Sequence, residues 1–266
     1  MEFISDKEYI LKDFLVDKGF SRKYIRRNKE KFLVNNKSLK LHEKINIGDV
    51  IFINTDEDSE INIVDYPLNI LYEDNDILIV YKEKGIPVIG TIRHYEFHLS
   101  GMILNYYKKN NINNTVHLVN RLDKDTEGIV IIAKNGYVKN LMKNTKIIKR
   151  YYALVEGIFD EEGYHIFKIS KDENSNKRFI SKEGSECFTY YKTKSIDHKN
   201  NTSLMDILLI TGRTHQIRVC FKGLNHPLVG DVIYNDKYSE NELFYLKNYK
   251  VEFIHPITKE NVIIEV

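Results

Sequence analysis

Short apolar runs of β type recur along the chain from about residue 67 onward. Four of them are rich in β-branched or aromatic side chains and are bounded by Gly, Asn, Asp or Lys: residues 77–81, 128–133, 151–155 and 204–210. Runs of this length and composition predict strands, and their recurrence predicts a central sheet. Helices are predicted between them, near residues 99–109, near 136–144 and from about Thr214 to Lys222.

The last of these helices carries an apolar stripe. Its members are spaced i, i+3, i+4 and i+7: Ile217, Cys220, Phe221 and Leu224. Such a stripe is more typical of a helix packed on a core than of a cofactor site. The chain contains no internal repeat and neither of the glycine-rich motifs that bind dinucleotides or nucleoside triphosphates.

The first 55 residues follow a different pattern. Helical spacing relates four apolar residues, Ile10, Leu11, Phe14 and Leu15. Gly19 is expected to end this first helix, and Ser21 to cap a second helix that begins near Arg22. Residues 32–35 and 45–53 then predict short strands joined by turns.

Composition places the chain among soluble globular proteins. It has 266 residues, of which 42% are hydrophobic and 29% charged, with a net charge of +2. That length fits one large domain or a medium domain with a small module. The two cysteines, Cys187 and Cys220, form no zinc-binding framework and suit a reducing compartment. With no signal-peptide pattern and no apolar run near the roughly 18 residues of a membrane span, we expect a cytoplasmic protein.

Positive charge is concentrated in residues 18–40. This segment holds nine Lys or Arg against one acid, Glu30, a local charge of +8. The predicted second helix carries five of the basic residues, Arg22, Lys23, Arg26, Arg27 and Lys29. Positions 22, 26 and 29 are expected to share one face. Such a face attracts phosphate through counterion release, although a merely solvated helix face has the same composition.

An acidic stretch follows at residues 56–60, and its like charges are expected to repel and not to pack. We therefore predict a small domain at residues 1–55, a linker at 56–66 and a large domain at 67–266.

Two polar segments could carry chemistry. Residues 121–128 place Asp123 just ahead of an apolar strand, and residues 211–218 place Arg218 on the polar face of the last helix. An arginine beside Asp123 would hold that carboxylate ionised and oriented. The alternatives without a catalytic role are an ordinary polar turn at residues 121–128 and an ordinary salt bridge for Arg218. His94 and His98 are spaced i, i+4, but no third ligand is evident, so we expect no metal site.

Around these residues the sequence resembles the RluA/RluD-type RNA pseudouridine synthases. The resemblance is carried by four separated blocks in the family's order, residues 118–128, 149–157, 212–219 and 226–231. With residues 67–88, which are similar to the family's opening strand and loop, it spans nearly all of residues 65–235.

The N-terminal segment resembles the S4-type RNA-binding module over residues 9–54. The matching features are Ser21-Arg22, the basic helix, Val34-Asn35 followed by Lys37, and Gly48-Asp49-Val50. Asn36 stands where the family's turn usually has glycine, and asparagine also tolerates a left-handed conformation.

The resemblance implies an α+β fold: a small S4-like αα-β module followed by a catalytic domain on a mixed, mainly antiparallel sheet with flanking helices. It implies isomerisation of uridine to pseudouridine in structured RNA, ribosomal or transfer, by a cofactor-free enzyme that works as a monomer. Asp123 would be the essential carboxylate, Tyr151 the aromatic against the target base, and Arg218 the ion-pair partner of Asp123. Arg121 would occupy the space left by the extruded nucleotide.

The catalytic blocks depart from the family at four places: Asn120, Glu127, Cys220 and Glu83-Lys84. Asn120 and Cys220 stand where histidine is usual. A non-catalytic RNA-binding or ribosome-assembly factor that keeps the fold is therefore the alternative from another class. A glycosidase-like enzyme acting on a small nucleoside is a third reading, disfavoured because it would not need the cationic module.

Overall fold

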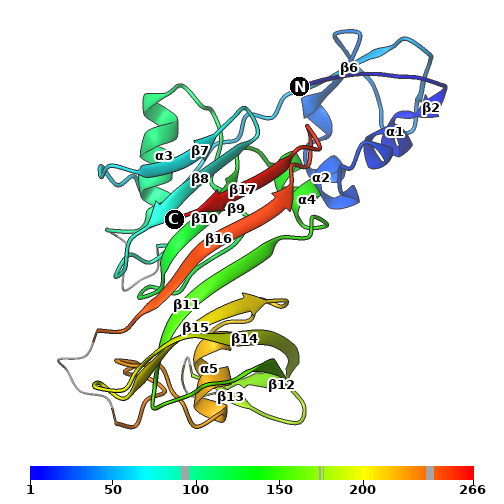
Figure 1. Ribbon diagram of the computed structural model, residues 1–266. Helices are drawn as coiled ribbons and strands as arrows, with labels where there is room; N and C mark the ends of the chain where they lie inside the picture. The colour runs from blue at the N-terminus through cyan, green and yellow to red at the C-terminus, as the bar shows by residue number, and fades with distance from the viewer. Residues whose placement is uncertain (91–95, 174, 176, 238–242) are drawn as a thin grey trace.

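The computed structural model describes residues 1–90, 96–173, 175, 177–237 and 243–266. Within these ranges the chain has the predicted α+β architecture, with a small N-terminal unit joined to a large sheet (Figure 1). Its helices are α1 (Leu11–Asp17), α2 (Arg22–Arg27), the 3₁₀ turn η1 (Lys29–Lys31), α3 (Leu99–Lys109), α4 (Gly136–Met142) and α5 (Gln216–Gly223).

The N-terminal module has the two predicted helices and short strands after them, and two further short strands that were not predicted precede the helices. Its four-stranded sheet has the order β1-β6-β3-β4, and β2 pairs with β5. The strands are β1 (Glu2–Ile4), β2 (Tyr9–Ile10), β3 (Phe32–Val34), β4 (Lys37–Ser38), β5 (Lys44–Ile45) and β6 (Val50–Ile53). The Ser21 side chain accepts a 3.1 Å hydrogen bond from the Tyr24 amide, which confirms the predicted cap. Asn36 has φ 63°, so the turn before β4 uses the left-handed conformation.

Two local predictions in this module were wrong. Residues 45–53 do not form one strand, because a turn separates β5 from β6. Gly48 has φ 83° there, and Asp49 accepts a 2.7 Å hydrogen bond from the Asn46 amide. Helix α2 ends at Arg27, so Lys29 lies in the 3₁₀ turn that follows and not on the helix face.

The large unit is one mixed sheet of 11 strands within the described residues. Its order is β13-β12-β14-β15-β11-β16-β10-β8-β7, with β17 beside β16 and β9 beside β10. Among the described strands every pair is antiparallel except β10 with β16. The strands are β7 (Asn69–Glu73), β8 (Ile77–Lys82), β9 (His117–Leu118), β10 (Glu127–Ala133), β11 (Ile148–Glu156), β12 (Glu162–Lys171), β13 (Arg178–Ile180), β14 (Ser185–Asp197), β15 (Thr202–Leu209), β16 (Leu246–Ile254) and β17 (Asn261–Glu265).

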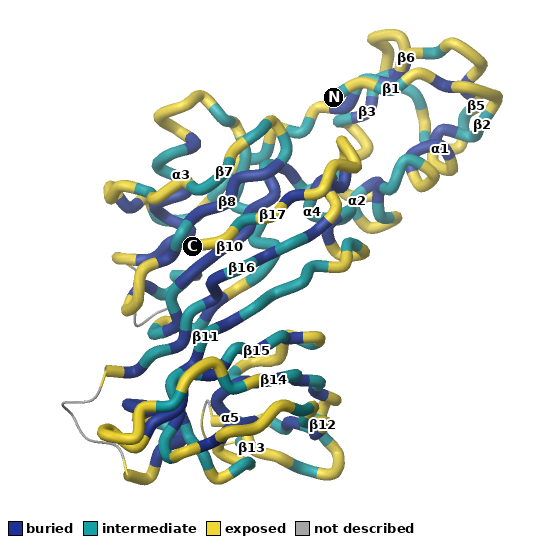
Figure 2. The backbone as a smooth tube through the Cα atoms, viewed as in Figure 1, coloured by how far each residue is buried: buried dark blue, intermediate teal, exposed yellow. Residues whose placement is uncertain are grey.

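Helices cover both faces of this sheet, and the strands β8 and β10 are buried between them (Figure 2). Because side chains alternate along a strand, Val80 and Val130 share one core with α3 and α5. Ile79 and Ile129 point the other way, into a core that also contains α4 and the N-terminal module. The module is therefore packed on the large sheet by a common hydrophobic core.

The acidic segment at 56–66 has no helix or strand, but the expectation that it does not pack was wrong. Glu57 is partly buried and its carboxylate lies 3.1 Å from the His117 ring. Val64 is buried, and its amide donates to the Gly101 carbonyl at the start of α3. The segment therefore lies against the large unit.

Candidate active site

One pocket of about 990 Å³ brings together the four residues predicted to carry chemistry. Arg121, Asp123, Tyr151 and Arg218 all line it. They come from the loop after β9, from β11 and from α5, which are far apart in the sequence. A volume of this order is at the upper end of the range for clefts that bind a small ligand.

Backbone contacts hold the loop that carries Asp123. The side-chain amide of Asn120 donates through Nδ2 to the Ile129 carbonyl at 3.1 Å, and its Oδ1 accepts from the Ile131 backbone amide at 2.7 Å. Asn120 thus fastens the loop to β10 without any titratable group. At the far end of the loop, a Cβ on Gly128 would lie 2.1 Å from the Asn248 carbonyl oxygen, so only glycine lets β10 approach β16 there.

A buried lysine supports the same loop, and sequence reasoning missed it. Lys82 is fully buried, and its ammonium donates to the carbonyls of Glu83, Ile86 and Lys124. Burial lowers the pKa of Lys82 to about 8, although the nearby Asp125 and Asp123 charges oppose the shift. In the sequence Lys82 is the first of three charged residues at the end of an apolar strand, and nothing there distinguishes it from Lys84.

Tyr151 lies on the pocket face of β11 and is buried. Burial raises its pKa, and the negative charge of Asp123 raises it further. The side chain is therefore a neutral phenol at physiological pH. A neutral aromatic ring with a hydroxyl suits stacking on a base and hydrogen bonding to its edge.

The predicted ion pair between Arg218 and Asp123 was wrong. Arg218 is only 5% exposed, and its guanidinium binds Asp231 instead, with Nε 2.7 Å from Oδ2 and Nη2 2.5 Å from Oδ1. Burial would lower the pKa of Arg218, but the hydrogen bonds and charge of Asp231, and the charge of Asp123, raise it. Arg218 therefore adds fixed positive charge near Asp123 while it is anchored elsewhere.

The side chain that pairs with Asp123 in the described part of the chain is His215, just before α5. Its Nε2 lies 3.8 Å from Asp123 Oδ2, and its Nδ1 lies 2.7 Å from the Tyr234 hydroxyl. His215 has φ 58°, a left-handed conformation that turns the chain into α5. Burial lowers its pKa, so the ring is neutral near pH 7. Its position beside Arg218 was evident in the sequence, but its contact with Asp123 was not.

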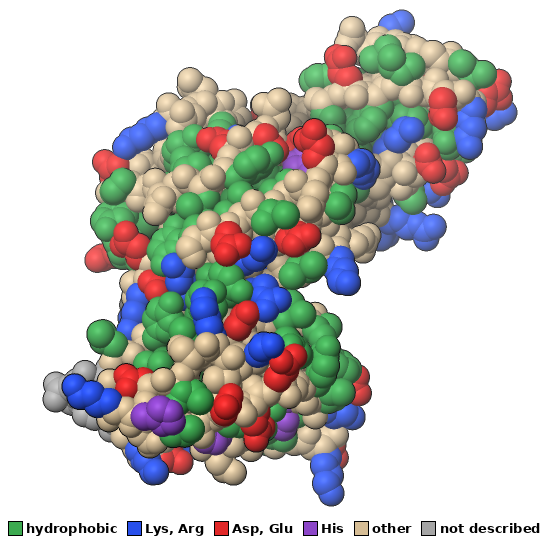
Figure 3. Space-filling view, viewed as in Figure 1, with side chains coloured by type: hydrophobic (Ala, Val, Ile, Leu, Met, Phe, Trp, Pro, Cys, Tyr) green, Lys and Arg blue, Asp and Glu red, His purple; other side chains and the backbone are tan. Residues whose placement is uncertain are grey.

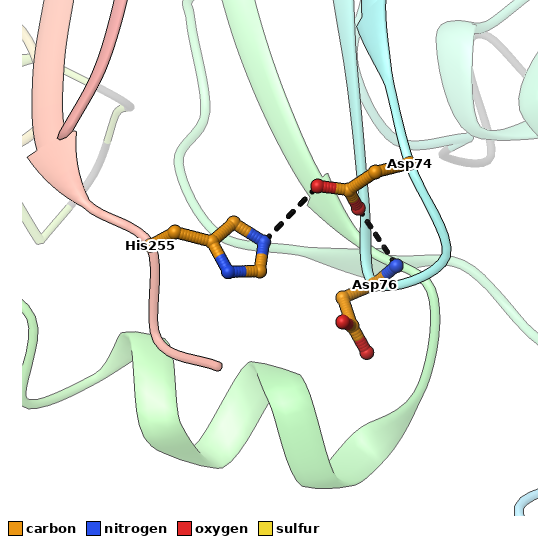
Figure 4. Close-up of side chains that lie close together, drawn as sticks. All are labelled: Asp74, Asp76 and His255. Carbon is orange, nitrogen blue, oxygen red and sulfur yellow. Dashed lines mark hydrogen bonds and ion pairs between the residues drawn. The ribbon is translucent and has the colours of Figure 1, made fainter. Parts of the chain in front are cut away.

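A second cluster of polar side chains lies outside the pocket (Figure 4). Ligand atoms of Asp74, Asp76 and His255 lie within 4.8 Å of one another. However, His255 Nδ1 accepts the amides of Ile257 and Thr258, so its proton is on Nε2 and faces Asp74 at 3.1 Å. A metal would need a lone pair on that nitrogen, so the cluster fits a structural link better than a metal site.

The histidine pair considered for metal binding is only partly described. His94 lies outside the described residues, whereas the His98 ring caps α3 by accepting the Gly101 amide at 3.0 Å. Cys187 and Cys220 are free and buried, and burial raises the pKa of Cys220 to about 12.

The five basic residues at and after α2 do not line the pocket. Arg22, Lys23, Arg26, Arg27 and Lys29 are all exposed. In the described part of the chain none of them forms an ion pair with an acid. Lys and Arg side chains project from the underside of the module in Figure 3.

The pocket is strongly cationic for a chain with a net charge of +2. Its acids are Glu60 and Asp123. Its lysines and arginines are Arg121, Lys124, Lys139, Lys149, Arg213 and Arg218. A carboxylate beside a buried aromatic ring, surrounded by excess positive charge, is typical of an enzyme that acts on a nucleic acid.

Comparison with known proteins assigns the family. Residues 76–222 match the model of the RNA pseudouridylate synthase family. The chain is 32% identical to the ribosomal large subunit pseudouridine synthase D of Blochmanniella floridana, covering 95% of this chain and 87% of that protein. It is 35% identical to the ribosomal large subunit pseudouridine synthase C of Buchnera aphidicola, covering 87% and 80%. The chain belongs to the RNA pseudouridine synthase family.

The fold agrees with this assignment. The structure of human RNA pseudouridylate synthase domain containing 4 superimposes with a TM-score of 0.60, covering 74% of this chain and 87% of that one at 19% identity. The protein is an isomerase that acts on RNA, and the non-catalytic alternative is not favoured. Within the described residues no helix is both long and apolar enough to cross a membrane.

Proposed function

We propose that this enzyme converts specific uridines to pseudouridine in structured RNA of the large ribosomal subunit, with transfer RNA as the other candidate. The names of its relatives from Blochmanniella and Buchnera support a ribosomal substrate. An rRNA substrate would place the enzyme in the cytoplasm. We further propose that it works as a monomer, because a single chain is sufficient to bring Arg121, Asp123, Tyr151 and Arg218 into one pocket.

Asp123 is the proposed essential carboxylate. The observation that carries this role is its position in the pocket, 31% exposed, beside buried Tyr151 and His215. Isomerisation breaks the N-glycosidic bond, turns the uracil within the pocket and rejoins it through carbon 5. A carboxylate can attack the ribose, add to the base, or promote elimination while it stabilises charge at the anomeric carbon. Asp123 has the access that each route needs.

Binding requires the target uridine to leave its stack. The free-energy cost of this step is offset by stacking on Tyr151 and by contacts to the uracil edge. Arg121 is exposed at the pocket and is the proposed side chain that fills the vacated space. The raised pKa of Tyr151 favours a stacking and hydrogen-bonding role over a phenolate base.

The N-terminal module is the proposed RNA grip, in the manner of an S4-type domain. Its exposed basic residues, unpaired with acids in the part of the chain that is described, are available to backbone phosphates. These contacts would add affinity and orientation, while the pocket selects a uridine that can flip.

Tritium release from RNA labelled at carbon 5 of uridine tests this proposal. Ribosomal and transfer RNA from cells that lack the gene are incubated separately with the wild-type protein and with Asp123→Ala. We expect wild type to release tritium from one pool and the variant to lose roughly 10³-fold or more of that rate. Equal release by the variant would remove Asp123 from the mechanism, and no release from either pool would contradict the proposed substrates.

A further inference from the structure

Lys149 is a pocket residue to which the mechanism above gives no role. It lies on β11 two residues before Tyr151, so both side chains point to the same face of the sheet. It lines the pocket together with Gly212 and Arg213. A Cβ added to Gly212 would come within 3.2 Å of Lys149 Nζ, so the ammonium group lies against the Gly212 backbone.

This ammonium has no partner among the residues that the structure describes. No hydrogen bond or ion pair joins Lys149 to any residue in the described ranges, in contrast to Lys82, whose ammonium donates to three carbonyls. Burial lowers the pKa of Lys149, and no nearby acid opposes that shift. A partly buried cation without a counterion destabilises the free protein.

The catalytic carboxylate does not fill this need. Among the described residues the Asp123 side chain forms an ion pair with His215 and none with Lys149. The Lys149 ammonium lies instead against Gly212, which lines the pocket beside Arg213. The missing anion has to arrive with the substrate.

The substrate offers only one kind of anion. Uracil and ribose are neutral at physiological pH, whereas every nucleotide of RNA carries a negative phosphate. We propose that Lys149 is a phosphate-binding residue of the pocket and pairs with a backbone phosphate that flanks the flipped uridine. This inference rests on the proposed function. It explains why the protein keeps an unpaired cation two residues from the base-stacking tyrosine.

The experiment compares RNA binding by three variants in an Asp123→Ala background, which prevents turnover. Lys149→Gln removes the charge, Lys149→Arg retains it, and Lys199→Gln removes the same charge from an exposed turn outside the pocket. The probe is a stem-loop RNA containing the uridine identified by tritium release. It is made with ordinary phosphates or with one neutral methylphosphonate on the 5′ or the 3′ side of that uridine.

We expect Lys149→Gln to weaken binding of the ordinary RNA about tenfold and to lower the slope of log Kd against log salt by about one. Lys149→Arg should retain most of the affinity, and Lys199→Gln should retain all of it. One of the two methylphosphonates should weaken the parent to the same extent and abolish the difference between the parent and Lys149→Gln. The Tm of Lys149→Gln should not fall, because removal of an unpaired, partly buried charge also removes its desolvation cost from the folded state.

Two results would overturn the inference. One is an unchanged Kd for Lys149→Gln on ordinary RNA. The other is an equal loss on ordinary RNA and on both methylphosphonate RNAs, which would assign Lys149 a packing role. Either result alongside tritium release by wild type leaves the proposed function intact. Absence of release by wild type would instead remove the proposed function and this inference together.

Discussion

His215 lies between the Asp123 carboxylate and the Tyr234 hydroxyl. The Arg178 amide donates to the Tyr234 oxygen at 2.8 Å, which leaves the hydroxyl proton free to point at His215 Nδ1, 2.7 Å away. In that arrangement the proton of the neutral imidazole is on Nε2 and faces Asp123 Oδ2. We therefore expect His215 to position the Asp123 carboxylate.

Replacement of His215 should slow the reaction without preventing RNA binding. We expect His215→Ala to lower kcat between roughly tenfold and a hundredfold with little change in KM. The reason is that a catalytic group displaced by about 1 Å reacts more slowly, although the RNA still binds. Tyr234→Phe keeps the ring and removes only the hydroxyl, and it should lower kcat in the same direction by less. A larger effect on KM than on kcat in both variants would contradict the positioning role.

The pH profile is a second readout of the same residue. Burial lowers the pKa of His215 below its usual value near 6.5, and the Arg218 and Arg178 charges act in the same direction, against Asp123 and Asp231. Protonation turns Nδ1 into a donor that faces the Tyr234 hydroxyl. We expect kcat to fall as the pH drops through this lowered pKa, and to lose that acid limb in His215→Gln. An unchanged acid limb would assign it to another group.

At the residue scale, the sequence motifs were sufficient to select Asp123, Tyr151 and Arg218, which the structure places in one pocket. They did not predict which acid binds Arg218, because Asp231 follows 13 residues later, beyond the helix that carries the arginine. The charges of Asp231 and Asp123 both raise the pKa of Arg218. Which of the two acids forms the ion pair depends on the path of the chain after α5. Polar partners of this kind are set by tertiary packing, which residue type alone does not determine.

At the element scale, strands with continuous apolar runs were predictable and amphipathic ones were not. β8 and β10 were predicted to within a residue because both of their faces are buried. β12 alternates exposed and buried positions at one end of the sheet, so its sequence shows no continuous run. Helix α3 was predicted at its observed bounds, Leu99–Lys109.

Helix α4 is the element that holds the N-terminal module on the catalytic sheet. Tyr137 stacks on Phe20 with ring centroids 4.2 Å apart, and its hydroxyl donates to the Lys18 carbonyl at 2.8 Å. Asn140 donates to the Gly19 carbonyl at 2.7 Å. These contacts join the turn between α1 and α2 to one face of a catalytic-domain helix.

Tyr137→Ala should therefore weaken both folding and the docking of the module. We expect a loss of about 3–5 kcal/mol in the free energy of unfolding, as for other large buried aromatics. Limited proteolysis should at the same time show faster cleavage in the segment at 56–66, in which Glu57 and Val64 contact the large unit. Tyr137→Phe is the matched control: it keeps the stacking and loses only the Lys18 hydrogen bond, about 1 kcal/mol. Unchanged proteolysis in a folded Tyr137→Ala variant would contradict the docking role.

At the scale of the whole molecule, groups of basic side chains lie at two separate places. One is the pocket, and the other is the exposed surface of α2 and the turn after it. A shared hydrophobic core and the packed segment at 56–66 join the units that carry them, so the two places keep a fixed separation. An RNA that reaches both places gains affinity from each, whereas a short RNA that fills only the pocket does not gain from the module.

Removal of the module's charge should therefore discriminate between long and short substrates. We expect Arg22→Ala, Arg26→Ala and Lys29→Ala together to weaken binding of full-length RNA at least about tenfold, and to reduce the slope of log Kd against log salt by as much as about three. A short stem-loop RNA of the kind used to test Lys149, labelled at carbon 5 of its uridine, should keep its kcat and KM. A control variant with Lys171, Lys182 and Lys199 changed to alanine loses equal charge from the large unit and should bind full-length RNA almost as wild type does. Equal weakening by the two triple variants would mean that net charge acts at long range. If only the module variant binds more weakly, and only to full-length RNA, then α2 is a contact made at a fixed distance from the pocket.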